Sequence, residues 1–221
     1  MPVTSDDHRR ADVRKPVPAT NRLRGLMPSE LDVTQRVLYD SIVAHEVPWA
    51  EGAGARAIGA DGQLLGPFDS LLRSPTISSA MLDVFRADKA NTSLPASAHE
   101  VVILAVGAAR HAAYELYAHT AIGTAADLPE ATIDAIVADE RPAFDSDEDA
   151  VAYDFARQLL RTDRVDDEAY ARAIAAFGER GVVDMVLLIG LYETVCELVN
   201  VFEVPVPTNG STARPARERE L

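Results

Sequence analysis

The chain has 221 residues, with 35 acidic and 21 basic side chains, a formal net charge of −14 and 48% apolar residues. This composition is typical of a globular protein with a sizeable core, and the acidic balance argues against a nucleic-acid partner. No apolar run is long enough for a membrane span, and the N-terminus lacks the apolar core of a signal peptide. One cysteine, Cys196, cannot form an internal disulfide, so we predict a cytoplasmic protein.

Three segments are expected along the chain. Residues 1–21 and 206–221 are polar, rich in Pro and Arg, and without periodicity, which predicts a flexible N-terminal arm and a flexible C-terminal tail. Residues 22–205 are predicted to form a single helical domain.

The first helix is expected from Ser29 to about His45, with Ser29 or Asp32 as its cap. Residues 46–66 are rich in Gly and Ala and predict a long irregular connection, either a lid or a subunit contact. A short helix is expected at Gly66-Pro67-Phe68, ending before Pro75.

The rest of the chain also shows helical periodicity. A helix is expected at 76–89, then a turn with Ser97 as the next cap, then two helices within 98–126 that separate between Gly107 and Arg110. The apolar run 101–106 also fits a strand, but its Ala-rich continuation favours a helix. Further helices are expected at 129–139, 147–162, 166–180 and 182–202. The sequence therefore predicts an all-α protein.

The densest group of ionisable residues in an apolar setting is Glu100, His111, Glu115 and His119. If residues 111–119 form one helix, the last three share a face, and Tyr114 lies beside them. A carboxylate bonded to one imidazole nitrogen fixes the tautomer of the ring and prepares the other nitrogen for proton transfer. The same spacing also fits an exposed ion pair without a function.

Metal and thiol chemistry have weaker support in the sequence. Neither the zinc-protease spacing of two histidines nor the repeated Glu-x-x-His of di-iron bundles is present, and the pair Glu193 and Glu197 is not diagnostic. Cys196 lies among apolar residues, where a free cysteine behaves as a small hydrophobe. We therefore expect no metal and no cofactor.

The stretch from Glu100 to Leu104, followed by Tyr114-Glu115 and His119, resembles the carboxymuconolactone decarboxylase-like family, which includes the alkylhydroperoxidase D proteins. The similarity extends from about 22 to 205 and includes Gly66-Pro67-Phe68, Ser74-Pro75, 189–192 and 200–202. It implies an all-helical alkylhydroperoxidase D-like fold that assembles as a homo-oligomer, a trimer or a hexamer, with its site near the subunit contacts.

The peroxidase branch of that family uses two cysteines before the histidine and a glutamate upstream. Placed on this chain, the histidine is His119, the glutamate is Glu100, and the cysteine positions hold Ala112 and Glu115. Thiol peroxidase chemistry needs a nucleophilic and a resolving thiol, so the resemblance does not carry that activity to this chain.

The resemblance instead implies a lyase of the decarboxylase-like branch, acting without a cofactor on a small organic acid or lactone. His119, Glu115 and Glu100 are then the expected catalytic residues, and Tyr114, Arg110 and His111 are expected to bind substrate. Arg73 is a second candidate for a substrate carboxylate. The alternative is a non-catalytic oligomeric binding protein with the same fold, in which Glu115 and His119 do not converge.

Overall fold

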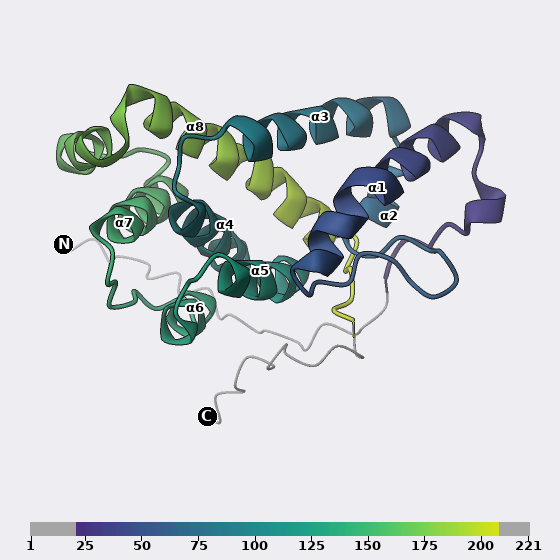
Figure 1. The fold of residues 1–221 in the computed structure, drawn as a ribbon, viewed down its shortest axis with the longest axis horizontal. Coiled ribbons are helices and arrows are strands. Elements are labelled where there is room, and N and C mark those ends of the chain that lie inside the picture. The colour runs from purple at the N-terminus through teal and green to yellow at the C-terminus, as the bar shows by residue number, and fades with distance from the viewer. Residues whose placement is uncertain (1–20, 208–221) are drawn as a thin grey trace, which may run out of the picture.

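The computed structural model describes residues 21–207. Within that range it contains a short 3-10 turn at Pro28–Glu30 and eight α-helices (Figure 1). The helices are α1 (Val33–Gly52), α2 (Pro67–Leu71), α3 (Pro75–Asn91), α4 (Ala96–Arg110), α5 (Ala113–Ala125), α6 (Glu130–Val137), α7 (Asp147–Thr162) and α8 (Asp167–Val201). An isolated bridge between Ile58 and Leu64 is the extent of β pairing in these residues. The all-α prediction is confirmed for the described residues.

The predicted arm and tail lie almost wholly outside the described residues, since only residue 21 of the arm and residues 206–207 of the tail are included. None of the helices within 21–207 has both the length and the apolarity needed to cross a membrane.

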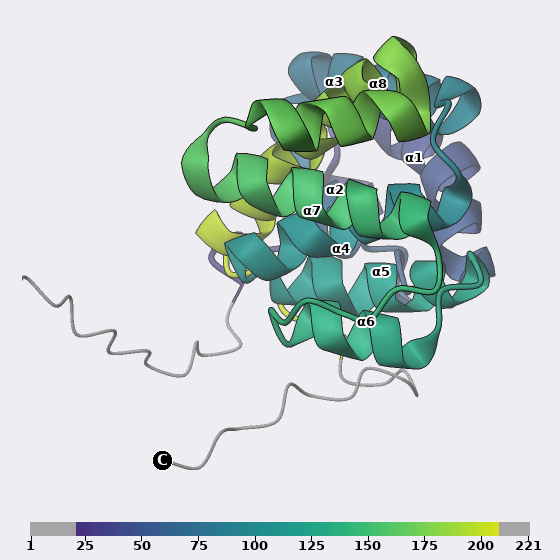
Figure 2. The same cartoon turned by 90° about the vertical axis from the view of Figure 1, so that its left-hand side faces the viewer.

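α4 is the central helix of the fold. It packs against α5, α6, α7 and α8, and Figure 2 shows it between α7 and α5. Every residue from Glu100 to Ala108 is buried. A helix that is covered on all sides needs no polar face, which explains why its sequence has no clear amphipathic period and also fits a strand.

The helix boundaries follow local capping chemistry. Asp32 accepts a hydrogen bond from the Gln35 amide at 2.8 Å, and the Gln35 side chain accepts one from the Asp32 amide at 3.0 Å, which confirms Asp32 as the cap of α1. Ser146 caps α7 with a single hydrogen bond, which its hydroxyl accepts from the Asp149 amide at 3.2 Å. The prediction for Ser97 is wrong, because α4 begins one residue earlier and the Ser97 hydroxyl donates to Asp149 at 2.8 Å.

The connection expected at 46–66 is shorter than predicted. α1 continues through Pro48 to Gly52, so Trp49 lies on a helix and the loop begins only after that helix. Proline removes one backbone donor from a helix, but Val47 and Ala50 on either side are buried. Burial of this last turn outweighs the local signal of Pro48 and the glycines.

The two helices expected at 166–180 and 182–202 are both present within α8, whose helical backbone is interrupted at Gly178, slightly earlier than predicted. That residue has φ 66° and ψ 177°, a conformation outside the helical region that glycine adopts without strain. The bend separates an N-terminal part near α7 from a long C-terminal part that crosses α4 (Figure 1).

Two apolar clusters make up the interior. One is built on α4, α7 and α8, and the other on α1, α2 and α3 with the loop between α1 and α2. Ala118 of α5 packs against both clusters. A cavity lies at this junction, and its wall includes residues of both clusters.

We expect Gly66→Ala to destabilise the protein by roughly 2–5 kcal/mol, combining left-handed backbone strain with overpacking. Gly66 has φ 65°, and a Cβ atom there would lie 2.3 Å from the Tyr114 ring, whose hydroxyl is held by the Arg56 carbonyl. Urea unfolding measures the change. Gly52→Ala is the control because its Cβ meets nothing within 4 Å, and equal stability of the two variants would contradict the expectation.

Candidate functional site

α5 carries the two central side chains of the site. Glu115 lies in its first turn and His119 one turn later, so both face the same side of the helix. His111 does not join them. α4 ends at Arg110, and His111 is an exposed residue with φ 53° between the two helices. The prediction that His111 shares the face of Glu115 and His119 is therefore wrong.

Glu100 reaches His119 from α4. Its Oε2 atom lies 2.8 Å from Nδ1 of His119, and both side chains are buried. Burial alone would raise the pKa of Glu100, but the interactions with His119 and His99 outweigh it and hold this pKa at about 2. An ionised carboxylate only accepts hydrogen bonds, so Nδ1 of His119 carries a proton. In the neutral ring, Nε2 is then left with its lone pair.

Glu115 has the opposite environment. Its Oε2 atom lies 3.7 Å from Nε2 of His119, and its side chain is almost completely buried. Burial raises the pKa of Glu115, the nearby His119 lowers it, and the charge of Glu100 adds to the increase. The net direction is upward, which favours the neutral acid. A neutral carboxyl group can donate a hydrogen bond as well as accept one.

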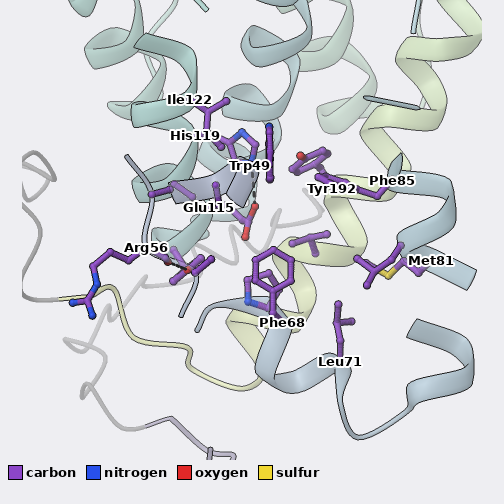
Figure 3. Close-up of a pocket in the computed structure, with 18 residues that line it drawn as sticks. Trp49, Arg56, Phe68, Leu71, Met81, Phe85, Glu115, His119, Ile122 and Tyr192 are labelled. Atoms are coloured by element: carbon purple, nitrogen blue, oxygen red, sulfur yellow. Dashed lines mark hydrogen bonds and ion pairs between the residues drawn. The ribbon is translucent and has the colours of Figure 1, made fainter. Parts of the chain in front are cut away.

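These two groups face an apolar cavity of about 60 Å³, large enough for a few waters or a small molecule that displaces them. In Figure 3 the Glu115 carboxyl group projects below the His119 ring among aromatic and aliphatic side chains. The Tyr192 ring stands nearly perpendicular to that of His119, with centroids 5.0 Å apart. The cavity wall includes Trp49, Phe68, Leu71, Met81, Phe85, Ile122 and Tyr192.

Sequence reasoning misses most of this wall. The predicted irregular connection at 46–66 includes Trp49, the single tryptophan, and the predicted helix at 76–89 includes Phe85 without any indication that it lines a cavity. Tyr192 enters only as part of the resembling stretch. The available signal is a set of aromatic residues on helices far apart in sequence, and this signal has no meaning until the helices are placed together.

The remaining predicted site residues are not all brought to the cavity. Tyr114 lines it, but its hydroxyl donates to the Arg56 carbonyl at 2.8 Å and holds the loop. Arg110 lies outside the cavity wall and pairs with Glu193. Arg56 lines the cavity, yet its guanidinium group points away from it (Figure 3).

Arg73, the other candidate for a substrate carboxylate, also lies outside the cavity wall and pairs with Asp69 at 2.9 Å. Cys196 is buried, and burial raises its pKa, so the thiolate is disfavoured. Residues 21–207 contain no cluster of three or more His, Cys, Asp or Glu side chains suited to a metal ion. The chemistry that the cavity itself offers is proton transfer by His119 and Glu115.

No protein-family model and no curated protein matches the chain. Solved structures share its fold, and two of them have the following similarity to this chain. One is described as the alkylhydroperoxidase AhpD core, an uncharacterized peroxidase-related protein from Ralstonia eutropha JMP134, at 16% identity and a TM-score of 0.68 over 88% of this chain and 95% of that one. The other is the debrominase Bmp8, a cysteine-to-alanine variant in complex with 2,3,4-tribromopyrrole, at 13% identity and a TM-score of 0.60 over 76% and 88%.

These similarities show that the chain has the alkylhydroperoxidase D-like fold, as the family resemblance implies. At identities this low, the similarity supports a shared fold but not a shared reaction. At the positions that the resemblance assigns to the two thiols, this chain has buried Ala112 and Glu115.

We expect Glu115→Gln to stabilise the protein increasingly as pH rises. A carboxyl group with a raised pKa in the folded state costs stability above its unfolded value of about 4.5, because unfolding releases its proton. Glutamine keeps the neutral shape and has no such cost. Each unit of pKa difference corresponds to about 1.4 kcal/mol, or ~3–6 °C in Tm for a chain of this size.

Thermal unfolding between about pH 5 and about pH 8 tests this expectation. Glu51→Gln, on the exposed surface of α1, is the matched control and should follow the wild type. A constant difference in Tm between Glu115→Gln and wild type across this range would show that the carboxyl group has an ordinary pKa.

Proposed function

We propose that the protein is a cofactor-independent acid–base enzyme of the lyase type that acts on a small organic acid or lactone, with decarboxylation as its reaction. The supporting observation is the convergence of Glu115 and His119, 3.7 Å apart, in an apolar cavity where Glu100 fixes the ring from behind. This convergence counts against the alternative of a non-catalytic binding protein.

The two cavity groups have complementary roles in the proposed reaction. When the bond between the carboxylate and its carbon breaks, the electron pair moves into an enolate and CO₂ leaves. Neutral Glu115 donates a hydrogen bond to the enolate oxygen, as an oxyanion-hole donor does. His119 takes up a proton from water at its free Nε2, delivers this proton to the carbon, and so returns to the neutral ring with its lone pair on Nε2. Glu100 does not line the cavity, so it acts as a positioning residue.

The cavity wall defines the substrate class. Aromatic and aliphatic side chains suit a compact ring, and the arginine side chain in the wall points away (Figure 3). A localised carboxylate is poorly solvated in such a site, whereas the transition state for CO₂ loss spreads its charge. The neighbouring debrominase structure holds a small ring, tribromopyrrole, which supports a ligand of this size on this fold.

We also propose that the protein is a homo-oligomer, a trimer or a hexamer. Val183, Val186 and Leu187 form an exposed apolar stripe at helical spacing on α8. Contiguous apolar side chains on a surface mark protein contacts more often than isolated ones do.

We expect His119→Ala to lower kcat/KM by about 10²–10⁴, the usual range for a lost general acid or base. Glu115→Ala removes the hydrogen-bond donor, which glutamine would keep, and should lower kcat/KM by about 10²–10³. The assay follows CO₂ release from a panel of lactone acids in deuterated water. It also measures how much deuterium is incorporated at the carbon that loses CO₂, because deuterium reaches this carbon only through the protonation step. His111→Ala is the control, because that residue is exposed and lies outside the cavity wall.

Equal turnover by wild type, His119→Ala and Glu115→Ala on every accepted substrate would overturn the proposed function. A wild-type protein that binds ring acids in the cavity but releases no CO₂ would instead support the non-catalytic alternative.

A further inference from the structure

Glu100 has a second imidazole partner that the proposed mechanism does not use. Its Oε1 atom lies 3.6 Å from Nδ1 of His99, while its Oε2 atom bonds to His119. The other nitrogen of His99, Nε2, lies 2.8 Å from Oδ2 of Asp88 on α3. Asp88, His99, Glu100 and His119 thus form a continuous chain of alternating carboxylates and imidazoles that begins on α3, crosses α4 and ends at the cavity.

The charges along this chain are complementary. Burial alone would lower the pKa of His99, but Asp88 and Glu100 raise it to about 9, so the ring is an imidazolium at neutral pH. An imidazolium has two N–H donors, and here each points to a different carboxylate. Asp88 and His99 are each less than 15% exposed, whereas Glu100 and His119 lie deeper.

We propose that His99, anchored by Asp88, is a positioning residue that holds the Glu100 carboxylate in place and thereby keeps His119 in the tautomer whose free Nε2 faces Glu115. The expected effect of His99 on turnover rests on the proposed function. The tautomer of His119, in contrast, can be measured in the free protein without a substrate.

The physical reason is the freedom of a carboxylate that has only one partner. Glu100 is held at Oε2 by His119 and at Oε1 by the charge of His99. Without that charge, the carboxylate can rotate about its terminal torsion, which is broad and weakly restricted. The bond to Nδ1 then weakens, and the ring loses the interaction that selects one nitrogen for its proton.

The test compares His99→Gln and Asp88→Asn with wild type. Long-range ¹H–¹⁵N NMR of the imidazoles, with the His119 ring in its neutral form, measures the fraction of each tautomer without any ligand. We expect the Nε2–H form of His119 to increase at least about threefold in His99→Gln and by less in Asp88→Asn. His45→Gln on α1 and Asp83→Asn on α3, both exposed, are matched controls and should not change it.

With a substrate in hand, kcat of His99→Gln should fall by about tenfold while KM stays within about twofold, because His99 lies outside the cavity wall. Asp88→Asn decides the question if His99→Gln fails to fold. An unchanged His119 tautomer in the folded variants overturns the proposal, whatever the activity. A changed tautomer in a protein that shows no turnover supports the positioning role and overturns only the proposed function.

Discussion

The hydrogen bond between Glu100 and His119 is the interaction on which the rest of the site depends. Glu100 lies in the central helix α4, where an ionised carboxylate without a partner would be very costly. His119, 2.8 Å away, supplies that partner from α5. The bond therefore connects two helices, satisfies a buried charge and decides which nitrogen of the ring faces the cavity. Structure and chemistry depend on the same pair of atoms.

Glu100 and Glu115 are the same type of residue, but their surroundings move their pKa values in opposite directions. Both glutamates lie within reach of His119, but Glu100 accepts a full hydrogen bond and also faces His99, and its pKa falls to about 2. Glu115 contacts His119 only at 3.7 Å and is otherwise surrounded by apolar side chains, so its pKa rises. Two carboxyl groups whose pKa values are moved apart are suited to different steps of one proton-transfer reaction.

The sequence is sufficient for the pattern within single helices and insufficient for contacts between them. The spacing of Glu115 and His119 on one helix follows from the 3.6-residue period, and the cap at Asp32 follows from local hydrogen bonding.

The prediction for His111 fails because residues four apart share a face only if the helix is unbroken. The helix breaks at His111, where φ is 53°, and no glycine or proline marks that position in the sequence. The pairing of Asp88 with His99 is also beyond sequence reasoning, because α3 and α4 meet only after folding. The same holds for the aromatic wall, since periodicity does not say which helix faces enclose a space and which fill the core.

The function that we propose depends on a carboxyl group at a position where the resemblance places a thiol. At the positions where the resembling peroxidases place their cysteines, this chain has Ala112 and Glu115. A thiol pair passes electrons, whereas a buried carboxyl group beside an imidazole passes protons. The remaining cysteine, Cys196, is buried, and its raised pKa disfavours the thiolate. With the Glu100–His119 pair present and no thiol at these two positions, the chemistry that we propose for the site is proton transfer and not redox cycling through a disulfide.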